Sequence, residues 1–268
     1  EAAGRADLVK SIDLFTKLSQ LETTPVMVDS ATDLKTYGLD KPQGNIVIQS
    51  KESKSDDGTL TLFVGKSENK LLYVRNSLEP FIYTISDTAL DFLPANNLPL
   101  RDARVVDLQL KQVRSMTITV GDKAPVTLNR SSGGTWSPAN VKDRMVDSTK
   151  AETQASLLCQ LQAKNWLGPI LPAYGLAKPV LTISLQAAKQ SPAEMPVPVT
   201  LTLLIGAPLP DGGHAAQIAG TPVAFELSDG DYGILNASSI ELLPGVLSGT
   251  NAAPTKPAAP TAAPAKKK

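Results

Sequence analysis

The chain contains two nearly identical hexapeptides, "YGLDKP" at residues 37–42 and "YGLAKP" at residues 174–179. Similar blocks follow both of them in the same order: "NIVIQ" and "TISLQ", then "TLTLFVG" and "TLTLLIG", then "PFIYTISD" and "PVAFELSD". The last pair of blocks is "TALDFLPA" and "SSIELLPG". The spacing between equivalent blocks of the two copies rises along the chain through 137, 141, 142 and 150 residues, and the order of the blocks never reverses. Collinear blocks with small insertions predict an internal duplication.

The stretch before each hexapeptide predicts a helix. In the first, one helical face carries Leu8, Ile12, Phe15 and Leu18. In the second, Thr149 and Glu152 indicate a capping box, and the apolar positions continue through Ala155, Leu158, Leu161 and Trp166. The stretches at 88–95 and 238–245 predict short helices that stop near a proline.

The stretches after each hexapeptide alternate with period two, as in strands with one buried face. The predicted fold class is therefore α+β: two repeated units, each a mostly antiparallel sheet with a packed helix. We place the first unit at residues 1–98, the second at 99–249, and a Pro/Ala/Lys tail at 250–268. The tail is expected to be disordered because it cannot bury enough apolar surface to offset the cost of ordering.

A strand pair opens the second unit and has no counterpart in the first. "SMTITVG" and "APVTLNR" predict a hairpin joined by Gly121-Asp122-Lys123. The first unit is therefore predicted to be incomplete, since it lacks its opening strands. Two explanations stay open: the sequence is a fragment cut inside a repeat, or the first unit borrows these strands from elsewhere.

The repeated positions are interpreted as a structural motif. The glycines supply backbone freedom, the prolines start an extended segment, and the leucines are expected to enter the core. The variable position is Asp40 in one copy and Ala177 in the other, which argues against a reactive acid. The motif residues are Tyr37, Gly38, Leu39, Pro42, Gly65, Tyr174, Gly175, Leu176, Pro179 and Gly206.

The sequence assigns no catalytic, cofactor or metal residues, and the protein is not expected to be an enzyme. His214 is the single histidine and is interpreted as a solvated loop residue rather than part of a triad. Cys159 is interpreted as an inert core thiol. Two acidic stretches, residues 54–58 and 226–233, are conceivable calcium sites, although polar turns are the favoured interpretation.

The charge and the hydropathy of the sequence argue against nucleic-acid binding and against a membrane-spanning helix. The 26 basic and 26 acidic residues give a net charge of zero and no basic footprint, so no nucleic acid is expected. No apolar run reaches the length of a spanning helix, so no membrane span is expected in this sequence.

The order of motifs resembles a known family. A helix, a YGLD-x-P motif, a strand ending in Val64 and Gly65, and "LRDAR" at 100–104 are similar to the DUF4340 family, a bacterial domain of unknown function. "TWSP" at 135–138 is also similar. The resemblance implies an N-terminal membrane anchor, a repeated extracytoplasmic body, and association with ABC-type transport systems related to gliding-motility auxiliary components. It supplies no catalytic residues.

These observations favour a non-catalytic scaffold or protein-interaction module of the cell envelope, membrane-associated through a segment outside this sequence. A protein partner is expected, with membrane transporter components as the class that the resemblance implies. The alternative is a protein that binds a small ligand or glycan in a groove between the two units. A hydrolase is the least favoured function. The sequence does not identify the partner, the oligomeric state or the strand order.

Overall fold

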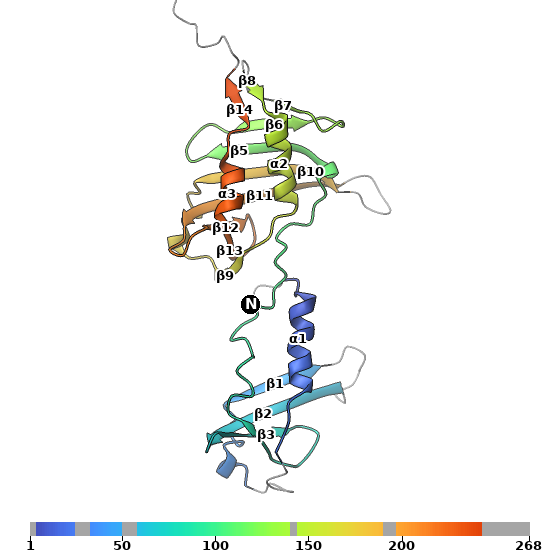
Figure 1. Ribbon diagram of the computed structural model, residues 1–268, viewed down its shortest axis with the longest axis vertical. Coiled ribbons are helices and arrows are strands. Elements are labelled where there is room, and N and C mark those ends of the chain that lie inside the picture. Colours follow the sequence, from blue (N-terminus) through green and yellow to red (C-terminus); the bar gives the residue numbers. More distant parts are fainter. Residues whose placement is uncertain (1–3, 25–32, 50–57, 140–143, 190–196, 243–268) are drawn as a thin grey trace, which may run out of the picture. The chain divides into compact units, whose positions relative to one another are not determined.

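The chain forms two compact units, Glu1–Asp102 (unit 1) and Ala103–Lys268 (unit 2). The computed structural model describes residues 4–24, 33–49, 58–139, 144–189 and 197–242 (Figure 1). The division lies a few residues after the boundary at residue 98 that the sequence pattern predicts, and the predicted tail at 250–268 lies outside the described residues. Antiparallel sheets combined with helices confirm the α+β fold class.

In its described residues, unit 1 contains one α-helix and a four-stranded antiparallel sheet of order β1-β2-β3-β4. Its elements are α1 (Leu8–Ser19), the 3-10 turn η1 (Lys35–Tyr37), β1 (Gly44–Gln49), β2 (Thr59–Glu68), β3 (Leu71–Asn76) and β4 (Tyr83–Ser86). The helix begins after Asp7, whose carboxylate accepts hydrogen bonds from the backbone N–H groups of Val9 and Lys10 at 3.0 and 3.1 Å.

Unit 2 is built on an eight-stranded antiparallel sheet of order β7-β6-β5-β10-β11-β12-β13-β9, with a separate β14-β8 pair. Figure 1 shows α2 and α3 lying across one face of the large sheet. Its elements are η3 (Leu110–Gln112), β5 (Val113–Val120), β6 (Val126–Arg130), β7 (Trp136–Pro138), β8 (Arg144–Val146), α2 (Ser148–Cys159), β9 (Asn165–Pro169), η4 (Pro172–Tyr174), β10 (Leu181–Lys189), β11 (Val197–Pro208), β12 (His214–Ile218), β13 (Val223–Leu227), α3 (Asp229–Asn236) and β14 (Ile240–Leu242).

The two units share one pattern of strand pairing. Ile46 pairs with Leu62 in unit 1 as Ile183 pairs with Leu203 in unit 2, which are the partners in the sequence blocks. The register between β2 and β3 shifts after Val64, and the register between β11 and β12 shifts after the matching Ile205. The similarity between the two units therefore includes the position of a shift in strand register. Duplication as the origin of this similarity stays an interpretation.

The cores of the two units differ in size. In unit 2 the large cluster joins the sheet to α2 and α3 and includes fully buried Met116, Leu158, Ile183, Leu203 and Ile205. In unit 1 the buried cluster consists of Leu72, Val74 and Ile85, with partly buried neighbours around it. Among the described residues, the sheet of unit 1 is therefore covered less completely than that of unit 2.

Several predicted element boundaries were wrong. The second helix ends at Cys159, so Leu161 and Trp166 lie beyond it, and Asp147 rather than Thr149 caps its start. Residues 88–93 form turns instead of a short helix. In 238–245, β14 pairs with β8 where a helix was predicted, and residues 243–245 lie outside the described residues. The stretch at 226–233 was interpreted as a polar turn, but its residues 229–233 lie in α3 and its first two residues lie in β13.

Candidate interaction surface

Each hexapeptide forms the joint between a 3-10 turn and the first strand of the shared pattern. Gly38 and Gly175 have positive φ angles of 67° and 65°, and their N–H groups close the turn onto Lys35 and Pro172 at 3.1 Å. The following Leu39 and Leu176 are both 6% exposed. The motif residues are thus engaged in equivalent structural contacts in both units.

Gly65 and Gly206, which end the matching sequence blocks, lie inside β2 and β11 and touch the same joint, so the strands continue past the glycines at which they were expected to end. A Cβ on Gly65 would overlap the carbonyl oxygen of Tyr37, and a Cβ on Gly206 would overlap that of Tyr174. The backbone of the joint therefore lies directly against the strand, which leaves no room for a side chain. This close approach explains why both strands have a glycine at this position, and the role of the two glycines is in packing.

His214 is not a solvated loop residue, which corrects the sequence interpretation. It is the first residue of β12, and its side chain is 14% exposed and stacked on Tyr232 with ring centroids 3.7 Å apart. Its Nδ1 lies 3.7 Å from Asp229 Oδ1, beyond hydrogen-bond distance, and has no hydrogen-bond partner among the described residues. The nearby Ser228 hydroxyl caps α3 by bonding to Asp231. The arrangement is not that of a nucleophile-base pair.

The acidic stretch at 226–233 is occupied by structural contacts. Glu226 accepts hydrogen bonds from Lys164 Nζ and Asn165 Nδ2, both at 2.6 Å. Asp229 accepts from the N–H of Gly213. Within the described ranges, no group of three His, Cys, Asp or Glu side chains converges to hold a metal ion. Of the other acidic stretch, 54–58, residues 54–57 lie outside the described residues.

Stability at low pH is expected to depend on Glu226. The hydrogen bond from Lys164 holds the pKa of this buried carboxyl below its usual value. A depressed folded-state pKa stabilises the fold above the unfolded pKa of about 4.3, and this contribution is lost as pH falls through the folded value. We expect Glu226→Gln to cost about 2 kcal/mol at pH 7 and to flatten the loss of stability below about pH 4.5, measured by urea unfolding across pH.

The control for this prediction is Asp122→Asn, which removes one carboxylate from the exposed turn between β5 and β6. Its stability should follow the wild-type dependence on pH. Equal flattening in both variants would contradict a specific contribution of the Lys164–Glu226 contact.

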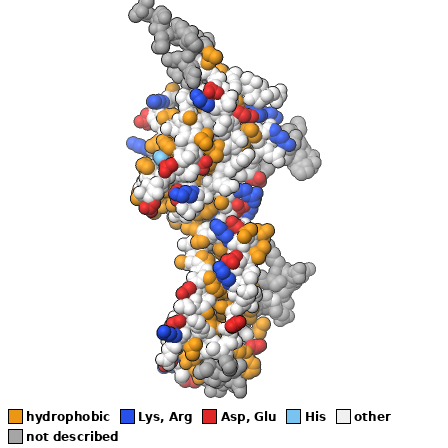
Figure 2. Space-filling view, viewed as in Figure 1, with side chains coloured by type: hydrophobic (Ala, Val, Ile, Leu, Met, Phe, Trp, Pro, Cys, Tyr) orange, Lys and Arg blue, Asp and Glu red, His pale blue; other side chains and the backbone are white. Residues whose placement is uncertain are grey.

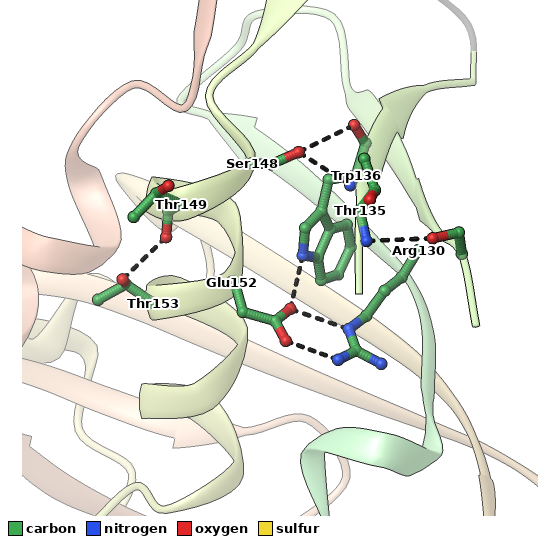
Figure 3. A network of polar contacts seen from close by, with 8 residues as sticks. Arg130, Thr135, Trp136, Ser148, Thr149, Glu152 and Thr153 are labelled. Carbon is green, nitrogen blue, oxygen red and sulfur yellow. Dashed lines mark hydrogen bonds and ion pairs between the residues drawn. The ribbon is translucent and has the colours of Figure 1, made fainter. Parts of the chain in front are cut away.

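A partly buried polar cluster joins α2 to the opening strands of unit 2 (Figure 3). Glu152 accepts two hydrogen bonds from the Arg130 guanidinium, at 2.9 and 2.6 Å, and one from Trp136 Nε1 at 2.7 Å. The hydroxyl of Ser148 accepts from the N–H of Trp136 at 3.0 Å. These contacts fix the face of α2 that lies over β6 and β7, and they satisfy the charges within the fold.

Two further features of unit 2 offer little chemistry. Cys159 is buried, as predicted, and burial raises its pKa to about 11, so the thiol is not a ready nucleophile. A cavity of about 340 Å³ has a largely aliphatic lining that includes Ile118, Val126, Leu181 and Leu235. It contains neither an acidic residue nor a histidine among its lining residues, so it lacks groups for acid–base work.

The most unusual surface of unit 1 is the outer side of α1. The sequence predicted that Leu8, Ile12 and Phe15 share one face of a packed helix, but these side chains are 73%, 56% and 56% exposed, and Val9 is 77% exposed. We call Leu8, Val9, Ile12 and Phe15 the α1 stripe. In Figure 2, apolar side chains gather on unit 1 over α1. Burying a side chain of this size stabilises by about 1.5–3 kcal/mol, so the stripe is available for a binding partner.

The edge of the sheet next to β1 is also open. Within the described residues β1 pairs with β2 alone, which leaves its outer N–H and C=O groups without a neighbouring strand. Val47 on this strand is 57% exposed. We call the α1 stripe together with the outer edge of β1 the open face of unit 1. Such a face can bind a polypeptide through both apolar contacts and main-chain hydrogen bonds.

Among the described residues, the structure is a two-unit α+β protein with an unpaired edge at β1 and no converged metal cluster. The chain belongs to the DUF4340 family: a family model described as "Domain of unknown function (DUF4340)" matches residues 4–179. The match confirms the resemblance and includes α1, both hexapeptides and the β5–β6 hairpin. No curated protein and no solved structure matches the chain.

Sequence reasoning missed the open face, although the signal was present. The helical spacing of apolar residues in α1 was recognised, and so was the absence of opening strands in the first unit. No helix among the described residues is long and apolar enough to cross a membrane.

Proposed function

We propose that this protein is a non-catalytic protein-interaction module, and that the open face of unit 1 binds its partner. The observation that carries the proposal is the α1 stripe lying in the same unit as the unpaired edge of β1. Contiguous exposed apolar residues and an unpaired strand edge are features of protein-binding surfaces. A soluble unit that kept them uncovered would be exposed to non-specific association.

The proposal also includes a location. The resemblance to the DUF4340 family implies a cell-envelope body outside the cytoplasm, anchored by an N-terminal segment and acting beside ABC-type transport components. We adopt this as the setting of the module. The partner would then be a polypeptide of the envelope, not a nucleic acid or a small molecule.

The non-catalytic part of the proposal is supported by the state of the candidate polar groups. Glu152 and Glu226 bind basic side chains within the fold, and the thiol of Cys159 has a raised pKa. A hydrolytic activity of the purified chain that disappears in His214→Ala would overturn this part.

Partner capture should depend on the α1 stripe. In the double variant Ile12→Lys/Phe15→Lys, we expect capture of envelope proteins by the immobilised chain to fall at least about tenfold, because two charges would be buried at the contact. Both side chains are exposed, so the free energy of unfolding should change by less than about 0.5 kcal/mol each. Quantitative mass spectrometry of the captured proteins measures the first effect and urea unfolding the second.

Leu78→Lys is the matched control, because Leu78 is 68% exposed in unit 1 but lies in the connection between β3 and β4. It should capture the same partner as the wild type. Equal capture by the wild type and the stripe variant, or equal loss in the control, would contradict the proposed surface.

A further inference from the structure

The aliphatic cavity of unit 2 is lined by the large sheet and by residues 235–239, which lead from α3 into β14. Its volume of about 340 Å³ is within the usual range of small-molecule sites. All of the residues that line it belong to unit 2. The cavity is therefore a different place on the molecule from the open face of unit 1.

The sheet contributes an apolar patch to the cavity. Ile118 lies opposite Val126 in the register of β5 with β6, and Val120 lies opposite Leu181 in the register of β5 with β10. Residues that are directly opposite each other, and residues two apart on one strand, point to the same face of a sheet. The four side chains therefore share one face, and all four line the cavity.

The opposite wall consists of short side chains on a fixed backbone. Residues 236–239 read Asn-Ala-Ser-Ser, and none of them is large enough to fill the space over the apolar patch. Gln154 of α2 is buried and donates from Nε2 to the carbonyl oxygen of Ala237 at 2.7 Å. The N–H of Asp147 donates to the carbonyl oxygen of Ser239 at 2.9 Å. Because these bonds hold the wall in place, it does not collapse onto the sheet, and the cavity is pre-formed.

The cavity has one kind of charge. Lys123, in the exposed turn between β5 and β6, is the one ionisable side chain among the described residues that line it. Leu181 and Leu235 line it as well, and both are buried. A cavity with aliphatic walls and a cation at its exposed side matches a molecule with an apolar body and an anionic end.

We propose that this cavity binds a single alkyl chain that ends in an anionic group. The chain lies against Ile118, Val126 and Leu181, and the anionic end lies beside Lys123. A carboxylate and a phosphate monoester share this chemistry, so the ligand is a fatty carboxylate or a single-chain alkyl phosphate. This site goes beyond the protein-binding role proposed for unit 1 and does not depend on it.

A series of straight-chain carboxylates from hexanoate to tetradecanoate tests the alkyl part. Each is titrated into the full chain below its micelle-forming concentration, and binding is measured by isothermal titration calorimetry. We expect the affinity to rise about fourfold with each added methylene, because each is removed from water, and to level off once the cavity is filled. Absence of binding throughout the series, or a rise without a limit, would overturn the proposal.

Ligands of equal chain length test the anionic end. Decanoate and decyl phosphate should bind about two- to fivefold more tightly than decanol, and decyltrimethylammonium should bind more weakly than decanol, because Lys123 is exposed and its charge contributes modestly. The tighter of the two anions identifies the kind of ligand. Lys123→Glu should reverse the preference, whereas Lys111→Glu, in η3 and outside the lining, should keep it. Equal affinity of the wild type for anion and ammonium would contradict the proposed orientation.

Val120→Trp locates the site, because this 38% exposed residue can accept a larger side chain that would occupy the cavity. We expect the affinity for decanoate to fall at least about tenfold. Val197→Trp is the matched control, since Val197 is 51% exposed at the start of β11 and does not line the cavity. Urea unfolding checks that both variants are folded. If Val120→Trp is not, the limit on chain length and Lys123→Glu still test the site.

The two proposals can fail separately. The stripe variant Ile12→Lys/Phe15→Lys should bind decanoate as the wild type does, although it loses the protein partner. Val120→Trp should capture the protein partner as the wild type does, although it loses decanoate. Binding of decanoate that persists in Val120→Trp, or that is lost in the stripe variant, would place the alkyl chain elsewhere and overturn the assignment of the cavity.

Discussion

Gly206→Ala is expected to destabilise unit 2 by about 3 kcal/mol, the upper end of the usual cost of overpacking. The new Cβ would overlap the carbonyl oxygen of Tyr174, and it would also lie 3.1 Å from the carbonyl carbon of that residue. These atoms belong to the backbone of the joint, so no side-chain rotation relieves the overlap. Either the joint or β11 must move, and β11 lies in the middle of the large sheet.

Chemical denaturation followed by circular dichroism measures this loss. Gly233→Ala is the matched control, because the added Cβ meets nothing within 4 Å and lies within α3. Because alanine has a higher helix propensity than glycine, the free energy of unfolding of Gly233→Ala is expected to rise by up to about 1 kcal/mol. Gly65→Ala should destabilise unit 1 for the same reason as Gly206→Ala, since its Cβ would overlap the carbonyl oxygen of Tyr37. A Gly206→Ala protein as stable as the control would show that the joint yields easily.

The parts of the fold that the sequence predicted are those coded by local pattern. Period-two alternation in β2 and β11 and the Gly-Asp-Lys turn between β5 and β6 are visible within a few residues. The hexapeptide was recognised because it occurs twice. Its contact with Gly65 and Gly206 was not predicted, since a backbone approach across the fold leaves no periodic signal.

The elements that were predicted wrongly depend on partners far along the chain. β14 forms because Ile240 and its neighbours pair with β8, and an apolar "IELL" run alone does not distinguish strand from helix. In α3 the two glycines lower helix propensity, yet Ser228 caps the helix, and Asp229 and Asp231 lie in its first turn. A search for capping residues would have found this helix.

The candidate surface required both the pattern and the structure. The spacing of Leu8, Ile12 and Phe15 predicts an apolar helix face but contains no information on what covers it. Counted from the caps Asp7 and Asp147, Ile12 of α1 takes the place of Glu152 of α2, and Ile12 is 56% exposed. Equivalent positions of the two units can also carry side chains of different chemistry. Thr24 contacts Thr84 in unit 1, whereas Lys164 contacts Glu226 in unit 2.

The exchange of apolar and charged residues at equivalent positions can be tested within unit 2. Glu152→Ile, which introduces the residue of unit 1, is expected to cost about 3–5 kcal/mol. The change leaves the Arg130 guanidinium, whose side chain is 11% exposed, without its carboxylate. It also removes the acceptor of Trp136 Nε1. Urea unfolding at pH 7 measures the loss.

The second change Arg130→Leu should recover part of this loss, because removing both charges avoids the cost of burying one alone. The double variant should remain about 1–3 kcal/mol less stable than the wild type, since Trp136 Nε1 still lacks its acceptor. Arg130→Leu alone should be destabilising, because it leaves the carboxylate of Glu152 with Trp136 as its remaining partner in the cluster. Additive losses in the double variant would show that Arg130 and Glu152 act independently.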